Sequence, residues 1–355
     1  WRSIRGEEMR ENRQSSRRYG FQIAMAYIGT VVGAGFATGQ EILQFFTRFG
    51  ASSYWGILIA GLLFILVGRK VLLYGSELHA GSYSVLLRHV FGAAAPLVNL
   101  YLVVSFVLLC GAMFAGAGAL FEEQWGIPYF VGALVTAVLT LFVTLWGVRG
   151  VLAINSVIVP LLITSSVLAF LHTVRNQFLP AASLGIVAPK GIFPIIRTGL
   201  TYASFNLVLS IGVLAPMGGA TRDRKSMSLG SLLGGGILTI LLCMGNYSLL
   251  CYVPEVFDRQ IPQLLIVREM GNAFVTFYSL VVWLEIFSTS VGNLFSVHTM
   301  MQEKFKTKSA LPAIAATTAG LIICAMGFSN IISRFYPILG IIGFALSAMI
   351  LFLKE

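Results

Sequence analysis

The sequence predicts an all-α integral membrane protein that crosses the bilayer about ten times. Only 11% of the 355 residues are charged, whereas a soluble domain usually has about 25%. Apolar residues make up 57% of the chain and are gathered in continuous runs. A helix needs about 20 such residues to cross a hydrocarbon core of about 30 Å. A membrane β-barrel would instead show alternating segments of about ten residues, so the runs favour helices.

The apolar runs define the predicted spans and the connections between them. In chain order the spans cover residues 21–49, 53–76, 94–121, 126–146, 151–172, 191–217, 227–252, 273–301, 309–328 and 331–353. Two of the long connections cover residues 77–93 and 253–272. We expect a short amphipathic helix in the first. The second contains two prolines and is either a gate or an ordinary connector.

Lysine and arginine residues are distributed unevenly between the two ends of these spans. With the N-terminus placed in the cytoplasm, 17 of the 24 Lys and Arg residues lie on the cytoplasmic side and 7 lie outside. Because basic residues gather on the cytoplasmic side of membrane proteins, we predict that both termini are cytoplasmic. We also predict a basic cytoplasmic segment over residues 1–20 and one transmembrane domain over residues 21–353.

The net charge of +10 is compatible with two kinds of partner, nucleic acid and anionic lipid. Basic segments beside a membrane span bind anionic headgroups. The lipid bilayer therefore explains the charge, and we expect no nucleic-acid partner.

The first span contains four glycines within eleven residues, Gly29, Gly33, Gly35 and Gly39. Each glycine weakens a helix by about 1 kcal/mol relative to alanine and permits unusual backbone angles. The Gly-x-x-x-Gly spacing also fits close helix packing, which is the alternative. Because the span is long enough to unwind in its middle, we predict a break around Gly33–Gly35 that faces a polar site.

Glu41 follows these glycines within the same span. A carboxylate in a span costs about 2.5–3.5 kcal/mol on insertion scales, and it usually faces a cavity or a partner. A position near the outer surface would reduce this cost. We therefore assign Glu41 to an outer gate in preference to an ion site.

The eighth span carries a second carboxylate, Glu285, near its middle. Ser288 and Thr289 follow three and four residues later and so lie on the same helical face. A carboxylate with two hydroxyls suits a hard cation or a proton, since both prefer oxygen partners. The alternative is a neutral glutamic acid that is hydrogen-bonded to a neighbouring helix.

The sixth span has a polar middle, with Thr201, Ser204, Asn206 and Ser210. It enters the membrane from the side opposite to the first span. Polar centres in spans one and six are the placement expected of a five-plus-five inverted repeat. The repeats would cover residues 21–172 and 191–353. No glycine or proline lies between residues 200 and 211, so a break is less evident here than in the first span.

The segment YIGTVVGAGFATGQEILQFF closely resembles the opening of the YkvI family of bacterial membrane proteins. Its most specific part is GTVVGAGFATGQE. The resemblance covers roughly residues 20–353, and that family looks like a compact branch of the amino acid–polyamine–organocation superfamily. It implies a LeuT-type fold with broken helices 1 and 6, a substrate pocket at their unwound middles and a location in the bacterial plasma membrane.

The resemblance also implies a possible sodium site between helices 1 and 8. Gly33-Ala34-Gly35 matches the Gly-x-Gly of the break. The carbonyl groups of Gly29 and Val32 would then bind the ion together with hydroxyl groups of Ser288 and Thr289, or of Thr289 and Ser290. Glu285 is not part of the usual sodium-site pattern, so both sodium and proton coupling stay open.

An unwound helix leaves N–H groups free on one side of the break and carbonyl groups free on the other. These ends attract a carboxylate and an ammonium group respectively. We therefore expect a zwitterion or an amine to bind in this pocket. The predicted substrate residues are Thr30, Val31, Gly33, Ala34, Gly35, Ser204, Phe205 and Asn206. Tyr27, Tyr101 and Tyr202 are weaker candidates for the pocket wall.

These observations predict a secondary active transporter of a small amino acid or related amine, coupled to sodium or protons. The alternative is a channel or a non-transporting membrane sensor of the same fold. The sequence contains no Walker motif to indicate ATP-driven transport. An enzyme is disfavoured because its four histidines are scattered without a metal-binding pair. We expect no cofactor besides the coupling ion, and no disulfide framework among the four cysteines.

Overall fold

The computed structural model describes residues 2–80, 83–146, 149–176, 191–221, 223–306 and 309–352, without the side chains of residues 2–15, 146–157 and 303. The described chain is helical. Its α-helices are α1 (Arg2–Val31), α2 (Ala34–Ala37), α3 (Gln40–Phe45), α4 (Ser53–Glu77), α5 (Tyr83–Phe91), α6 (Ala95–Trp125), α7 (Tyr129–Trp146), α8 (Arg149–Asn176), α9 (Phe193–Ala220), α10 (Arg224–Leu250), α11 (Pro262–Arg268), α12 (Asn272–Phe305), α13 (Leu311–Cys324) and α14 (Phe328–Phe352). Short 3₁₀ helices cover Thr47–Ser52, Gly92–Ala94 and Glu255–Asp258.

The predicted spans correspond to these helices. Seven helical segments of the described chain are long and apolar enough to cross a membrane, and α7 and α13 are shorter apolar helices. The interrupted first span, made of α1, α2 and α3, brings the set to the number that the sequence predicts. The connection after α4 contains α5, as expected. The connection after α10 contains a 3₁₀ turn and α11.

The first span is interrupted, which confirms the prediction from its glycines. Helix α1 ends at Val31, and Gly33 is extended with φ −109° and ψ −170°. Helix α2 then makes a single turn. Gly39 follows it in the left-handed region with φ 79°, a conformation that glycine adopts without strain. The chain therefore changes direction twice before α3 begins.

The predicted break in the sixth span is wrong. Helix α9 is continuous from Phe193 to Ala220. Two of the polar residues in its middle bond back to their own helix: Asn206 Nδ2 donates to the Tyr202 carbonyl at 3.1 Å, and Ser210 Oγ donates to the Asn206 carbonyl at 2.7 Å. With no glycine or proline between residues 200 and 211, these side chains satisfy themselves without unwinding the backbone.

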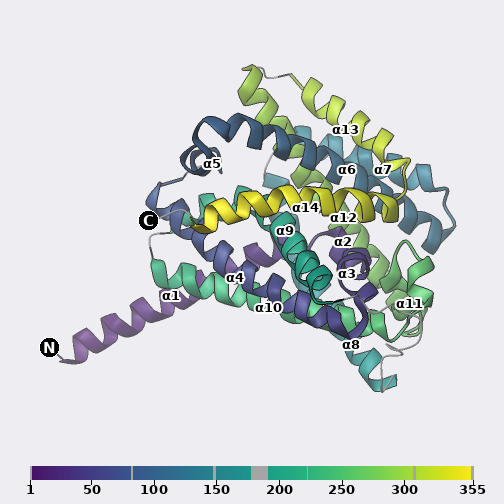
Figure 1. Ribbon diagram of the computed structural model, residues 1–355, viewed down its shortest axis with the longest axis horizontal. Helices are drawn as coiled ribbons and strands as arrows, with labels where there is room; N and C mark the ends of the chain where they lie inside the picture. The colour runs from purple at the N-terminus through teal and green to yellow at the C-terminus, as the bar shows by residue number, and fades with distance from the viewer. Residues whose placement is uncertain are drawn as a thin grey trace.

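The helices form two groups, as Figure 1 shows. Helices α1, α4, α9 and α10 pack together, with the most extensive contacts between α4 and α9 and between α1 and α10. Helices α6, α7, α12 and α13 form the second group, and α14 lies against α9. In an inverted repeat, each span of the first half corresponds to the span five places later. Span two (α4) then corresponds to span seven (α10), and span one (which begins with α1) corresponds to span six (α9). The α4–α9 pair is therefore equivalent to the α10–α1 pair, as an inverted repeat requires.

Helices α4 and α9 approach so closely because small residues face one another. A Cβ atom on Gly199 would lie 2.3 Å from the Gly56 carbonyl oxygen. Small residues at such contacts let helix backbones pack tightly within a membrane. This contact holds α9 tightly against α4.

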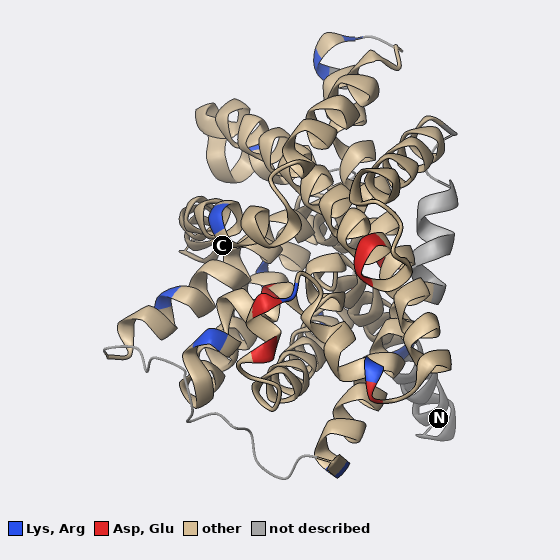
Figure 2. Ribbon diagram, turned by 90° about the vertical axis from the view of Figure 1, so that its right-hand side faces the viewer, with Lys and Arg blue, Asp and Glu red and all other residues tan. Residues whose placement is uncertain are grey.

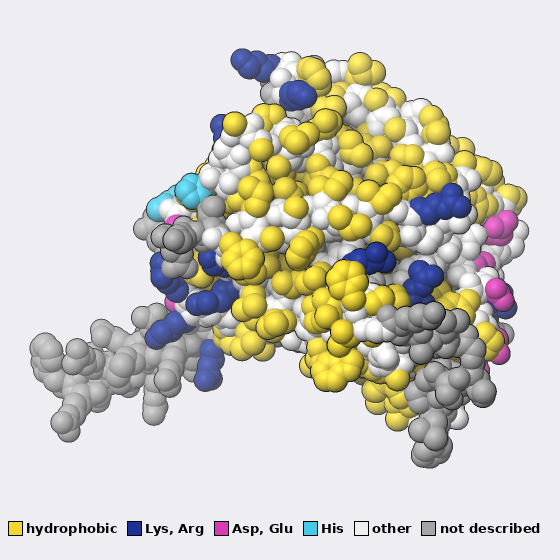
Figure 3. Space-filling view, viewed as in Figure 1, with side chains coloured by type: hydrophobic (Ala, Val, Ile, Leu, Met, Phe, Trp, Pro, Cys, Tyr) yellow, Lys and Arg dark blue, Asp and Glu magenta, His cyan; other side chains and the backbone are white. Residues whose placement is uncertain are grey.

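The outer surface of the bundle is apolar. Charged positions are sparse along the ribbon in Figure 2. Figure 3 shows hydrophobic side chains over much of one face, with His and several Lys and Arg toward the left-hand edge, further Lys and Arg at the top and on the right-hand half, and acidic side chains mainly at the right-hand edge. Strongly exposed apolar residues include Leu97, Phe130, Phe142, Ile322 and Phe352. A wide apolar surface bounded by charged ends is what a bilayer requires.

Candidate functional site

A cavity of about 440 Å³ lies at the interruption of the first span. It is enclosed by the end of α1, the start of α2, and faces of α6, α9 and α12, with Tyr83 and Tyr336 contributed by α5 and α14. Its lining residues are Gly29, Thr30, Val31, Gly33, Ala34, Glu41, Tyr83, Leu102, Phe106, Leu109, Met113, Phe205, Asn206, Val208, Leu209, Ile211, Gly212, Val213, Ser288, Thr289, Gly292, Asn293, Phe295, Ser296, Thr299 and Tyr336.

Most residues predicted to hold a substrate meet at this cavity. Six of them line it: Thr30, Val31, Gly33, Ala34, Phe205 and Asn206. Gly35 and Ser204 are buried but lie outside the lining. The weaker candidates Tyr27, Tyr101 and Tyr202 also lie outside it. The hydroxyl of Tyr27 donates to the Phe64 carbonyl at 2.8 Å, and that of Tyr101 donates to the Leu339 carbonyl at 2.7 Å.

The structure places only some of the residues predicted to bind the coupling ion at the cavity. Gly29, Ser288 and Thr289 line the cavity, whereas Val32 and Glu285 are buried outside its lining. Within the described chain, the break leaves the carbonyl oxygens of Gly29 and Val32 without a backbone N–H partner. Carbonyl oxygens at a broken helix end are typical ligands of transported cations.

Thr289 lies on the side of α12 that faces the break. Its Oγ1 is 3.6 Å from the position of a Cβ atom on Gly33. The neighbouring hydroxyls bond to their own helix: Ser288 Oγ donates to the Glu285 carbonyl at 3.1 Å, and Ser290 Oγ donates to the Ile286 carbonyl at 2.7 Å. Thr289 is therefore the hydroxyl of this group that lies nearest to the unwound segment.

Glu285 occupies the same face of α12 as two residues that reach the first span. Tyr278, seven residues earlier, donates a hydrogen bond from its hydroxyl to the Ala37 carbonyl at 2.7 Å. Thr289, four residues later, lies beside Gly33. Residues four and seven apart share a helical face, so Glu285 lies opposite α2. Its side chain is 2% exposed, and its Oε2 has no hydrogen-bond partner among the described residues.

Glu41 belongs to the cavity itself. It is 5% exposed, and it is the one charged side chain among the described lining residues. Its carboxyl group lies against Gly35, since a Cβ atom there would be 2.0 Å from Glu41 Oε1. The other oxygen, Oε2, has no hydrogen-bond partner in the described chain. The sequence predicts a gate role for Glu41, and in the structure its carboxyl group lies beside the break and lines the cavity.

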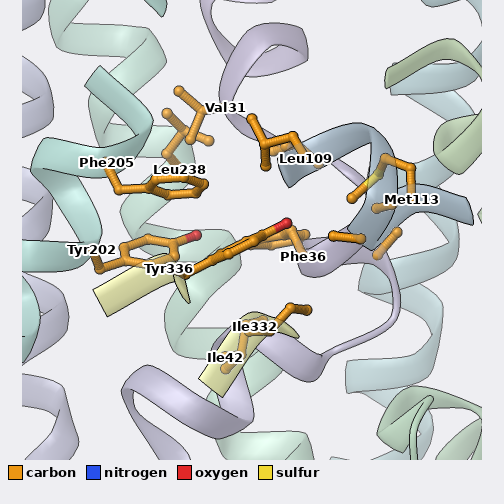
Figure 4. Packing of buried hydrophobic residues seen from close by; sticks show 14 of the residues in the cluster. Val31, Phe36, Ile42, Leu109, Met113, Tyr202, Phe205, Leu238, Ile332 and Tyr336 are labelled. Carbon is orange, nitrogen blue, oxygen red and sulfur yellow. The ribbon is translucent and has the colours of Figure 1, made fainter. Parts of the chain in front are cut away.

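Two tyrosines complete the surroundings of Glu41. Tyr202 and Tyr336 are fully buried and lie close enough to Glu41 to interact with it electrostatically. Tyr202 is within loose hydrogen-bonding range of the Glu41 carboxyl group, but neither tyrosine hydroxyl makes a hydrogen bond of good geometry within the described chain. Figure 4 shows these tyrosines with Phe205, whose ring centroid is 4.5 Å from that of Tyr336. The site therefore combines a carboxyl group with phenol groups and aromatic rings.

The cavity is closed at one end. Gln263 N donates to the Thr38 carbonyl at 3.0 Å, and Gln40 Nε2 donates to Ser329 Oγ at 2.6 Å. With the bond from Tyr278 to Ala37, these contacts fasten the second half of the first span to α11, α12 and α14. The lining extends the other way, toward α5 and the second half of α12.

Two groups of lining residues were missed by the sequence predictions. Leu102, Phe106, Leu109 and Met113 form one stripe along α6, and Asn293, Ser296 and Thr299 continue the polar stripe of α12. The α6 stripe has the helical spacing of any buried face, so nothing in the sequence separates it from ordinary core. The α12 stripe was detectable as polar residues three and four apart within an apolar span.

A curated relative matches nearly the whole chain. The Bacillus subtilis membrane protein YkvI is 33% identical over 337 residues, which cover 94% of this chain and 95% of YkvI. The chain belongs to the YkvI family. No family model matches this YkvI-family chain.

Solved structures share the fold of the YkvI-family chain at low sequence identity. MhsT, solved in complex with L-phenylalanine, has a TM-score of 0.63 at 17% identity over 94% of this chain and 88% of its own. Mhp1 in an inward-facing conformation has a TM-score of 0.61 at 14% identity over 94% of this chain and 75% of its own. These similarities place the YkvI-family chain in the LeuT-type fold.

Proposed function

We propose that this YkvI-family protein is a secondary active transporter that moves a small amino acid or a related amine by alternating access. The observation that carries the proposal is a one-sided cavity at a break in the first span. Alternating access needs a central site that is closed toward one side of the membrane while it is reached from the other. Three hydrogen bonds close one end of this cavity, and its lining extends toward the other.

The proposed orientation places both termini and α5 in the cytoplasm of a bacterial cell, within the plasma membrane. The cavity then extends toward the cytoplasm, and α11 covers its outer end. The asymmetry of Lys and Arg supports this orientation.

The proposed coupling ion is sodium or a proton, bound between the first span and α12. Sodium would be held by the carbonyl oxygens of Gly29 and Val32 with hydroxyl oxygens of Ser288 and Thr289. The free carbonyl groups at the break and the nearness of Thr289 support this site. Glu285 is the proposed proton-responsive group, because it is buried opposite the same segment. The gate role of Glu41 stays a prediction.

Transport by the purified protein in lipid vesicles tests the proposal. Labelled amino acids and amines are supplied with an inward sodium gradient, an inward proton gradient or neither, while the membrane potential is clamped at zero. A secondary transporter accumulates its substrate above the outside concentration only when a gradient is present. Equilibration without accumulation identifies a channel, and binding without movement identifies a sensor. Either of these outcomes contradicts the proposal.

A further inference from the structure

The cavity contains one carboxyl group and, among its described lining residues, no lysine, arginine or histidine. We infer that Glu41 binds the ammonium group of the substrate, and that the substrate is a primary amine with one positive charge, an apolar body and no carboxylate. This inference rests on the proposed transport function and chooses between the two substrate classes that it leaves open.

The first argument is the state of the Glu41 carboxyl group. Its side chain is 5% exposed, and one oxygen has no partner in the described chain. A buried carboxylate is costly unless a cation or several hydrogen-bond donors face it. Since the described lining provides no cationic side chain, an ammonium group from the substrate is the partner that the site lacks. Tyr202 and Tyr336 are placed to contribute hydroxyl groups around the same carboxyl.

The second argument is the absence of a place for a substrate carboxylate. The space directly over Gly35 is filled by the Glu41 carboxyl group. A second carboxylate beside it would meet a like charge at close range, which disfavours ionisation of both groups. Without a cationic side chain in the described lining, only the backbone N–H groups freed at the start of α2 could offset that repulsion, and the Glu41 carboxyl group already lies over Gly35 there. A zwitterionic amino acid therefore fits this cavity worse than the corresponding amine.

The third argument is the wall that faces the substrate body. Leu102, Phe106, Leu109 and Met113 form a continuous apolar stripe along α6, and Phe205 and Tyr336 present aromatic rings. Figure 4 shows Leu109 and Met113 on α6 and Phe205 on α9, around the labelled tyrosines. A diamine would place its second ammonium group against apolar side chains, at a high desolvation cost. The cavity therefore favours a single charge with an alkyl or arylalkyl body.

A matched set of ligands tests the inference on the unmodified protein. 2-Phenylethylamine and L-phenylalanine differ only by the α-carboxylate, and hexylamine and putrescine provide an alkyl monoamine and a diamine. Binding is measured calorimetrically on full-length protein in lipid nanodiscs, with and without sodium, because sodium could accompany a carboxylate. We expect one of the monoamines to bind at least about tenfold more tightly than L-phenylalanine and putrescine, the loss expected for one unpaired charged contact.

The outcomes separate this inference from the proposed function. Tighter binding of L-phenylalanine or putrescine than of both monoamines overturns the inference, while transport of either ligand would still support the function. If a monoamine binds but never accumulates in vesicles, the proposed transport function is contradicted, while the assignment of Glu41 as the ammonium-binding residue still stands. Failure of both monoamines to bind overturns the inference.

A substitution tests whether Glu41 is the residue that binds the ammonium group. Glu41→Gln keeps the size of the side chain and removes its charge, so monoamine affinity should fall at least about tenfold. The control is Glu255→Gln, the same change at an exposed position in the 3₁₀ turn before α11. Both variants are checked by thermal unfolding. Unchanged monoamine affinity in a folded Glu41→Gln protein overturns the role of Glu41, and if that variant does not fold, Glu41→Asp is tested for an intermediate loss.

Discussion

The carboxyl group of Glu41 lies directly over Gly35, so that a Cβ atom on Gly35 would be only 2.0 Å from Glu41 Oε1 and 2.5 Å from Glu41 Cδ. This position can hold no side chain unless Glu41 moves away. The contact joins α2 to α3 across the turn at Gly39 and fixes one wall of the cavity. It makes the smallest substitution at Gly35 a probe of the site.

Gly35→Ala should displace the Glu41 carboxyl group and weaken substrate binding by about tenfold or more, since one charged contact is worth about 1.5–3 kcal/mol. Gly236→Ala is the control, because a Cβ atom on Gly236 in α10 would meet nothing within 4 Å. Ligand affinity and thermal unfolding are measured for both. Equal affinities in the two folded variants would show that the position of Glu41 does not matter for binding.

Glu285→Gln should remove the dependence of uptake on the ion gradient. Glutamine keeps the shape and hydrogen bonding of the side chain but cannot titrate. Each charge that is carried across gains about 2.3 kcal/mol per 100 mV of membrane potential, enough for more than tenfold accumulation. We expect accumulation to disappear while substrate exchange across the membrane persists.

The measurement for Glu285 is the accumulation ratio in vesicles at several pH and sodium values. Asp258→Asn, at an exposed position in the 3₁₀ turn before α11, is the control for removing one carboxylate. Wild-type pH and sodium dependence in the Glu285→Gln protein would mean that this residue is structural.

The membrane spans were predictable because length and hydropathy decide them. The separation between the last two spans shows the limit. The sequence places it at residues 329–330, but α13 ends at Cys324 and α14 begins at Phe328. Gly327 makes the turn with φ 82°, a conformation that favours glycine and that hydropathy does not register.

The candidate site was predictable only in part. Polar and glycine-rich positions within apolar spans identified the first span, α9 and α12. The place of Glu41 was not predictable, because residues six apart in a continuous helix are separated by about 9 Å along the axis. Only the change of direction at Gly39, which lies between the two residues, brings Glu41 back over Gly35.

Asp223→Ala should destabilise the start of α10. The Asp223 carboxylate accepts hydrogen bonds from the backbone N–H groups of Lys225 and Ser226 at 3.0 and 3.2 Å, and from the hydroxyl groups of Ser16 and Ser226. Loss of such an N-cap costs about 1 kcal/mol. The hydrogen bond from Ser16, followed by that from Ser226, lowers the pKa of Asp223 to about 2.

The pH dependence of that loss follows from the sign of the shift. Because the pKa of Asp223 is lower in the folded protein than its ordinary value of 3.8, its contribution is complete above pH 3.8 and disappears as the pH falls through about 2. The difference in unfolding temperature between wild type and Asp223→Ala should therefore shrink over this range. Asp258→Ala, which removes the same charge at an exposed position, should leave the unfolding temperature nearly unchanged. A constant difference down to pH 2 would contradict the assigned role.

Tyr278→Phe should loosen the closed end of the cavity. The Tyr278 hydroxyl donates to the Ala37 carbonyl at 2.7 Å and so fastens α12 to the end of α2. Removing one hydrogen bond costs about 1 kcal/mol, which changes the balance between two conformations about fivefold. Because Gln263 N is bonded to the Thr38 carbonyl, next to Ala37, α11 should open more often. Hydrogen exchange of the amide groups in α11 should rise accordingly, whereas exchange in α13, which has no extensive contact with α2 or α11, should stay as in the wild type. Unchanged exchange in α11 would show that this bond does not hold the cavity closed.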